Sequence, residues 1–194
     1  MLLIVFFVLL IFLSISGIFS GSKDDLLQIL NMQQANIVTD LNEQLNRLVA
    51  QGVSTSEEIT QILGDQLHTK PISALNDDAE KLYQLESTLY GSLNTALRSN
   101  PCSGAYVVLN ATINTASENA QNSRAGLYLR FANLSDKNQV NQDVTLYRGI
   151  ANVSRENRLE LHNRWRLEFD TSKLPGYANT IAHPVNRPIE NYTW

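Results

Sequence analysis

The sequence predicts an α+β chain: an apolar helix at the N-terminus, then a long helical region, then a β-sheet. Three observations carry this prediction. Residues 1–13 are an unbroken apolar run, and no charged residue occurs before Lys23. From about residue 22 to residue 98, apolar residues recur three and four positions apart, as on one face of a helix. After Gly104 the chain has short runs rich in β-branched and aromatic residues, which are typical of strands.

Residues 1–21 are predicted to be a transmembrane anchor or signal-anchor. The stretch Leu2–Phe19 approaches the length of about 20 residues that a bilayer-spanning helix needs. A cleaved signal peptide is the alternative, because the same run fits its apolar region. The absence of a basic segment before the run favours the anchor. The body of the chain is then expected to be extracytoplasmic, in a single-pass protein of the cell membrane.

Residues 22–52 are predicted to form a stalk helix. Ser22 offers an N-cap oxygen, and Gly52 is a natural stop. Two interpretations stay open: an amphipathic helix that packs on its own domain, or a membrane-proximal stalk that pairs with a second subunit in a homodimer. One face has heptad spacing with two glutamines in apolar positions: Leu27, Leu30, Gln34, Ile37, Leu41, Gln44 and Leu48.

Residues 53–194 are predicted to be one domain, helical over residues 53–100. A capping box at Ser54–Glu57 predicts a second helix that ends before Pro71. A third helix is expected over residues 77–98, because its leucines fall on one face: Leu82, Leu85, Leu89, Leu93 and Leu97.

Residues 104–194 are predicted to hold the sheet. The composition predicts three strands, a short helix at Arg155–Leu161, and a loop from Pro175 to Trp194. Arg166–Asp170 is expected to be a fourth strand or an extended segment. The three strands are Ala105–Leu109, Gly126–Phe131 and Val144–Arg148.

Composition and motifs exclude several classes of function. The net charge is −4 and the isoelectric point about 5.3, so this segment is not expected to bind nucleic acid directly. Between Arg124 and Arg187, however, ten Lys or Arg residues stand against six Asp or Glu. With Cys102 as the single cysteine and three scattered histidines, no metal site, cofactor or intrachain disulfide is expected. No catalytic motif occurs, so we do not expect an enzyme.

In the second half of the chain, arginines stand close to aromatic or acidic residues in three places, and this indicates a ligand-binding site. An Arg fork fits a carboxylate, an aromatic ring gives a flat apolar wall, and an Asp accepts from an ammonium or a hydroxyl. Together they would suit a small zwitterion, an amino acid or carboxylate, or another polar metabolite. Separate structural roles are the alternative: Trp165 in the core, Arg148 in a salt bridge and Asp170 as a turn acceptor. The candidate ligand-binding residues are Arg124, Tyr128, Tyr147, Arg148, Trp165 and Asp170.

The order of these parts, and the segments 104–112, 119–129, 146–149 and 161–170, resemble bacterial extracytoplasmic Cache/PDC-type sensor domains. Similar domains precede AraC-type DNA-binding domains or diguanylate cyclases. The resemblance implies a PAS-like antiparallel sheet flanked by helices, with the ligand on its membrane-distal face near the six candidate residues. It also implies later strands, which this sequence lacks, so the sheet is expected to be incomplete at the C-terminus.

The sequence thus predicts the extracytoplasmic ligand-sensing domain of a membrane-anchored bacterial signal-transduction receptor. It would bind a small polar metabolite and relay binding to a cytoplasmic output domain outside this chain. The alternative is a membrane-anchored structural protein whose coiled-coil stalk and α/β cap bind another protein.

Overall fold

The computed structural model describes residues 2–15, 18–68, 70–100, 102–133, 142–174 and 176–177. The chain divides into two compact units, Met1–Arg47 and Leu48–Trp194, and each is described by itself.

The first unit is helical. Helix α1 covers Leu2–Ile15, and α2 begins at Ile18 and continues into the second unit as far as Leu67. No helix in the described ranges is both long and apolar enough to cross a membrane. The transmembrane helix predicted within residues 1–21 is therefore unsupported by the structure.

Helix α2 is continuous over 50 residues, so the predicted stop at Gly52 and the predicted new helix at Ser54 are wrong. A glycine inside a helix costs only about 1 kcal/mol relative to alanine, which packing can offset. The second half of α2 has such packing, because Ile59, Ile62 and Leu63 lie against the core of the second unit. The hydroxyl of Thr60 also donates to the carbonyl of Ser56 within the helix, at 2.7 Å.

Helix α3 spans Ala79–Ser99 and confirms the helix expected over residues 77–98. Asp78 caps its N-terminus by accepting a hydrogen bond from the backbone N–H of Lys81, at 3.0 Å. A short 3-10 helix, η1, covers Ile72–Leu75 before it. The leucine stripe is buried as expected, with exposed fractions between 0% and 2%: Leu82, Leu85, Leu89, Leu93 and Leu97.

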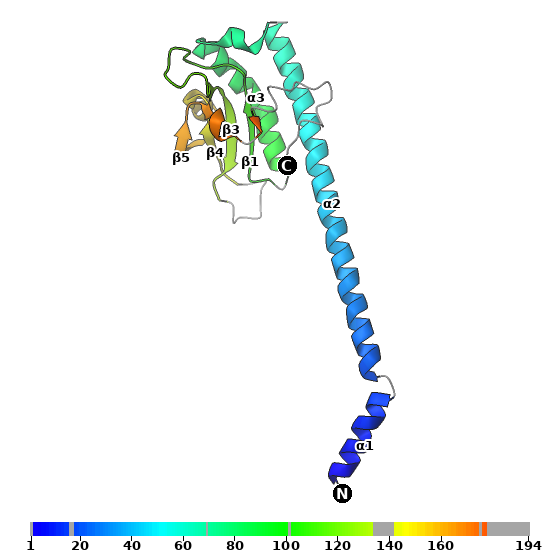
Figure 1. Cartoon of the computed structure of the whole chain (residues 1–194). Coiled ribbons are helices and arrows are strands. Elements are labelled where there is room, and N and C mark those ends of the chain that lie inside the picture. The colour runs from blue at the N-terminus through cyan, green and yellow to red at the C-terminus, as the bar shows by residue number, and fades with distance from the viewer. Residues whose placement is uncertain are drawn as a thin grey trace. The chain divides into compact units, whose positions relative to one another are not determined.

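The main sheet has four strands in the order β1-β3-β4-β5 (Figure 1). The three predicted strands are confirmed within a residue: β1 is Gly104–Val108, β3 is Gly126–Phe131 and β4 is Val144–Arg148. These three pair antiparallel. A separate pair joins β2, Ser123–Arg124, to β6, Phe169–Asp170. The short 3-10 helix η2, Thr171–Lys173, follows β6.

The fourth strand, β5, covers Glu160–Arg166 and pairs parallel to β4, so the prediction of a purely antiparallel sheet is wrong. The short helix predicted at Arg155–Leu161 is also misplaced, since α4 covers Ala151–Glu156. The two corrections have one cause: a parallel partner needs a crossover connection, and α4 provides it. Most of the predicted C-terminal loop, residues 178–194, lies outside the described residues.

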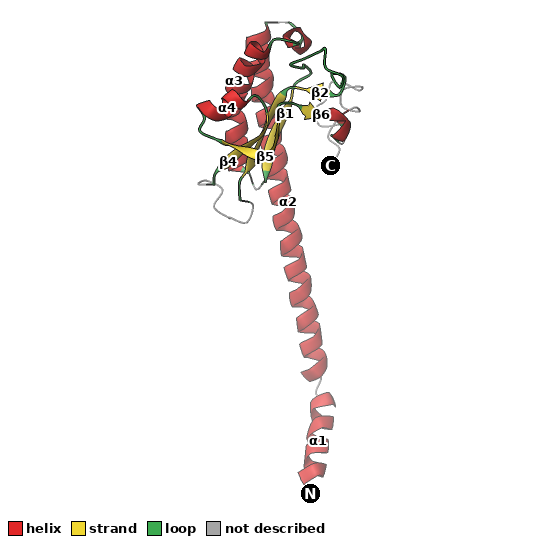
Figure 2. Cartoon of the chain, turned by 90° about the vertical axis from the view of Figure 1, so that its left-hand side faces the viewer, coloured by secondary structure: helices red, strands yellow, loops and turns green. Residues whose placement is uncertain are grey.

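The two faces of the sheet differ. Leu127, Leu129 and Phe131 alternate along β3 into the core, while Tyr128 and Arg130 point to the opposite, outer face. Figure 2 shows α3 and α4 on one side of the sheet and the β2–β6 pair on the other. The outer face, beside β2 and β6, is therefore the face that the helices leave open.

Gly126 makes the close approach of β3 to β1 possible. Its φ is +148°, and a Cβ at this position would stand 2.2 Å from the carbonyl oxygen of Val107. Only glycine fits such a position without a shift of the backbone.

Candidate functional site

A cavity of about 840 Å³ opens beside the ends of β4 and β5 and the β2–β6 pair. Four basic and two acidic side chains line it, and Tyr147 and Phe169 supply aromatic walls. The lining residues are Asn119, Ser123, Tyr147, Arg148, Arg164, Arg166, Leu167, Glu168, Phe169, Asp170, Lys173 and Leu174.

The strand geometry of β5 delivers two of the arginines. Successive side chains of a strand point to opposite faces. Arg164 and Arg166 therefore line the cavity, while Trp165 between them packs against the core cluster. Both arginine residues are exposed.

Arg148, at the end of β4, is held more firmly than these two. Its Nη1 donates to the carbonyls of Tyr147, at 2.7 Å, and Arg164, at 3.0 Å. Its guanidinium carbon also lies 4.5 Å from the centre of the Tyr147 ring, a cation–π contact. Burial lowers the pKa of Arg148 from its ordinary value. Arg148 thus ties β4 to β5 at the edge of the cavity.

The two carboxylates of the cavity are already engaged. Asp170 pairs with Lys173 at 2.6 Å and accepts from the backbone N–H of Ser172 at 3.3 Å. Hydrogen bonds from Lys173 and Ser172 lower the pKa of Asp170. Glu168 accepts from the hydroxyl of Thr112 at 2.9 Å and the N–H of Ile113 at 2.7 Å, and also from Ser123.

The arginines of the cavity, in contrast, have no carboxylate partner in the described part of the chain. The only ion pairs found there join Lys81 to Asp78 and Lys173 to Asp170. The cavity therefore has an excess of positive charge at Arg148, Arg164 and Arg166.

A row of aromatic rings crosses the outer face next to this cavity. The ring centres of Tyr106 and Tyr128 are 5.7 Å apart, those of Tyr128 and Tyr147 are 5.0 Å apart, and Tyr147 lies 4.5 Å from His162. Phe169 adds a contact at 6.0 Å from Tyr106. Partial burial is the main cause that lowers the pKa of His162. The positive charges of nearby arginines, Arg164 among them, lower it further. The outer face is thus aromatic as well as basic.

The structure brings three of the six predicted site residues to the cavity: Tyr147, Arg148 and Asp170. Asp170 nevertheless acts as the turn acceptor of the alternative interpretation, because it caps η2. Tyr128 lies one ring away, in contact with Tyr147.

Two predicted residues do not line the cavity. Arg124 lies on β2, and its side chain donates to the carbonyls of Ala120, at 2.9 Å, and Ser123, at 2.7 Å. Trp165 packs on the core, and its Nε1 donates to the carbonyl of Gly149 at 3.0 Å. For Trp165, the core alternative considered from the sequence is the one that the structure bears out.

The cavity lining also includes Arg164, Arg166 and Lys173, which are not among the predicted site residues. The signal was available in the alternation of residues 162–166, which places two arginines on one face if the segment is a strand. The predicted helix at Arg155–Leu161 ends just before this segment, and the predicted fourth strand begins only at Arg166.

A second cavity of about 390 Å³ lies in the second unit between α2, α3 and β1. Its lining is mainly apolar, with Leu48, Ile59 and Leu93 among its residues, and the half-buried Cys102 at its edge. In the ranges that the structure describes, no three His, Cys, Asp or Glu side chains gather as metal ligands would.

Comparison with known proteins finds no match among family models, curated proteins or solved structures.

Proposed function

We propose that this chain is a ligand-sensing segment of a bacterial signal-transduction receptor, and that the cavity beside β4, β5 and β6 binds a small polar ligand. The observation that carries the proposal is the set of three arginines without carboxylate partners at one cavity. Ligand cavities hold a few placed polar groups, charged side chains among them, and arginine is frequent where a carboxylate or phosphate is recognised.

A chain of contacts from the cavity to the helices supports a sensing role. Two residues after Arg148, the backbone N–H of Ile150 donates to Glu86 of α3 at 2.7 Å. Further along α3, the hydroxyl of Ser92 donates to Glu58 of α2 at 2.7 Å. A ligand that prefers one arrangement of β4 and β5 would thereby shift the equilibrium between two arrangements of α3 on α2.

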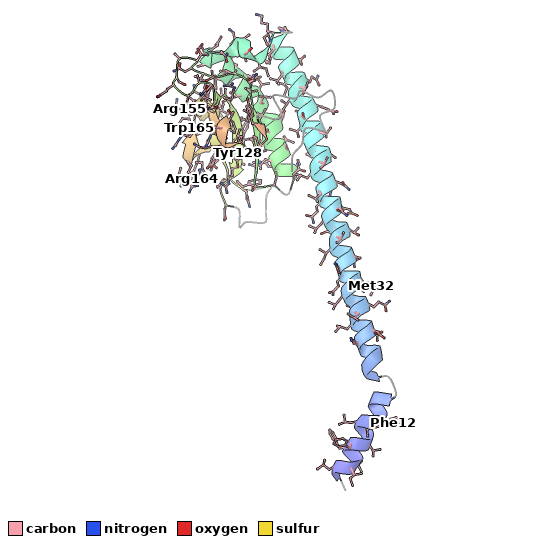
Figure 3. The ribbon with its side chains drawn as sticks, in the orientation of Figure 1. Phe12, Met32, Tyr128, Arg155, Arg164 and Trp165 are labelled. Atoms are coloured by element: carbon pink, nitrogen blue, oxygen red, sulfur yellow. The ribbon has the colours of Figure 1, made fainter. Side chains whose placement is uncertain are left out.

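The experiment is isothermal titration calorimetry on the full chain in non-ionic detergent, which covers the exposed apolar side chains of α1. A panel of amino acids, carboxylates, phosphate esters and sugars is titrated into the wild type. The best ligand is then titrated into Arg164→Gln, which removes one cavity charge. Arg155→Gln is the control, because Arg155 is an exposed arginine on α4 outside the cavity (Figure 3).

Ligand binding that weakens in Arg164→Gln and is unchanged in Arg155→Gln supports the proposal. Equal affinity in the three proteins places any binding outside the cavity and contradicts it. Absence of binding across the whole panel also contradicts it.

We further propose that the chain is membrane-anchored, with its body extracytoplasmic. The support is in the sequence, where residues 1–22 have no charge. Fusion of alkaline phosphatase after residue 177 tests this in a bacterial host. Activity is expected if the body is exported, and an inactive fusion that remains cytoplasmic would contradict export.

A second candidate is a structural protein whose stalk pairs with another chain. The observation in its favour is the apolar stripe on α2, where Leu30, Ile37 and Leu41 are 51%, 60% and 52% exposed. Pairing and sensing are compatible, since a paired stalk can transmit a change made in the ligand-binding domain.

A further inference from the structure

We propose that the ligand of the cavity beside β4, β5 and β6 is a small dianion, a dicarboxylate or a phosphate monoester, bound by Arg148, Arg164 and Arg166. This inference rests on the proposed ligand-binding function and narrows it to a chemical class.

The charges of the cavity set the class. Among the described residues, its lining has four cations, Arg148, Arg164, Arg166 and Lys173, and two carboxylates, which leaves a net charge of +2. The ion pair between Lys173 and Asp170 cancels within the protein. Two negative charges on the ligand would complete the balance, and arginine pairs well with both carboxylate and phosphate.

The acidic residues argue against a zwitterion. An ammonium group needs a carboxylate with free acceptor capacity. Asp170 is already paired with Lys173 and accepts from Ser172. Glu168 already accepts from Thr112, Ile113 and Ser123. The two carboxylates thus have most of their acceptor sites filled, and a ligand ammonium would also meet the excess positive charge of the three arginines.

The arginines retain the donors that a dianion requires. A guanidinium has five N–H donors. Arg148 uses its Nη1 for two carbonyls, and Arg166 uses its Nη1 for the carbonyl of Trp165 at 2.9 Å. The remaining donors of Arg148 and Arg166, and those of Arg164, can reach a ligand. The ring of Tyr147 and the carbonyls of Tyr147 and Arg164 hold the Arg148 side chain in place. The exposed side chains of Arg164 and Arg166 can then adjust around a ligand bound to Arg148.

The test is calorimetric titration of the full chain in non-ionic detergent with five probes: succinate, glycerol 3-phosphate, acetate, alanine and glucose. We expect at least one dianion to bind at least tenfold tighter than acetate, alanine or glucose. We expect that dianion to lose about tenfold in affinity in Arg164→Gln and in Arg166→Gln, and nothing in Arg155→Gln. Unchanged melting temperatures of the ligand-free variants verify that they fold.

The two dianionic probes distinguish a dicarboxylate ligand from a phosphate monoester. Binding of succinate alone assigns a dicarboxylate, and binding of glycerol 3-phosphate alone assigns a phosphate monoester. If alanine or glucose binds tighter than both dianions, and Arg164→Gln weakens it, the ligand class is wrong while the ligand-binding function stands. If a dianion binds equally well to Arg164→Gln and Arg166→Gln, its assignment to this cavity is overturned. If none of the five probes binds, the dianion inference fails, and the wider panel then decides the binding function.

Discussion

The side chain of Glu86 accepts a hydrogen bond from the backbone N–H of Ile150, with an oxygen–nitrogen distance of 2.7 Å. Its other oxygen accepts from the N–H of Gly126 at 3.1 Å. One carboxyl group on α3 thus holds the start of β3 and the turn that follows β4. Glu86 is fully buried, and burial raises its pKa from 4.5 to about 8, against the opposing effect of the two hydrogen bonds.

The first prediction concerns pH. Because the folded-state pKa of Glu86 lies above its unfolded value, its contribution to stability is complete below pH 4.5 and declines until the pH passes about 8. The free energy of unfolding should fall by up to about 1.4 kcal/mol per pH unit in this window from this group alone. Urea unfolding between pH 5 and pH 8.5 measures the slope.

Glu86→Gln, which cannot ionise, should flatten that slope. Glu80→Gln is the matched control on the same helix, because Glu80 is exposed and accepts from the side chain of Gln84. Parallel curves for wild type and Glu86→Gln would show that Glu86 is ionised throughout the range.

The second prediction compares two glycines. Gly126→Ala should lower the free energy of unfolding by at least about 2 kcal/mol, because its Cβ would collide with the carbonyl of Val107 at an unfavourable φ. Gly91→Ala on α3 should raise it by up to about 1 kcal/mol, since Gly91 is helical with nothing within 4 Å of an added Cβ. Thermal and urea unfolding of the two variants test the opposite signs, and a loss in both would contradict the helix argument.

The third prediction separates structure from binding at two adjacent residues. Trp165→Phe removes the hydrogen bond to the carbonyl of Gly149 and should cost about 1 kcal/mol of stability. Ligand affinity should be unchanged, since Trp165 faces the core. Arg164→Gln should do the reverse, with unchanged stability and weaker binding. If Trp165→Phe binds the ligand weakly but keeps full stability, the prediction is contradicted and Trp165 contributes to ligand binding.

The fourth prediction addresses the stalk. In a Cys102→Ser background, Ile37→Cys and Gln34→Cys should cross-link two copies of the full chain readily on mild oxidation, because both positions belong to the heptad face. Met32→Cys is the control, as Met32 lies on the opposite side of α2 by helix geometry (Figure 3). Gel electrophoresis without reductant compares the rates. Equal rates at residues 32 and 37 would indicate random collision rather than pairing.

Elements with strong local periodicity were predictable from the sequence. The leucines of α3 repeat at helical spacing, and β3 alternates between core leucines and outer polar residues, so both were placed within two residues of their observed bounds. Gly52 was misleading because the end of a helix depends on tertiary packing as well as on local propensity. Ile59 and Leu63 supply that packing, and their partners lie far away in the sequence.

The candidate site was predictable only in part, for a related reason. Tyr147 and Arg148 end a recognisable strand, but Arg164 and Arg166 point to the cavity only once β5 is known to be a strand beside β4. That pairing is parallel and is made across the intervening helix α4, so residues 160–166 do not indicate it by themselves. The engagement of Asp170 by Lys173 likewise depends on η2, which a sequence pattern does not specify.

The parallel pairing of β4 with β5 also has a kinetic consequence. β5 pairs with β4 alone in the described sheet, and it can do so only after the chain has passed through α4. As an edge strand held by a single neighbour, β5 is expected to open at a lower free energy than α3, whose leucines are buried in the core. The cavity arginines on β5 would then be dispersed by a local opening that leaves the leucine core intact. Amide hydrogen exchange at residues 160–166 should accordingly be faster than in α3, and a bound ligand should slow it there most.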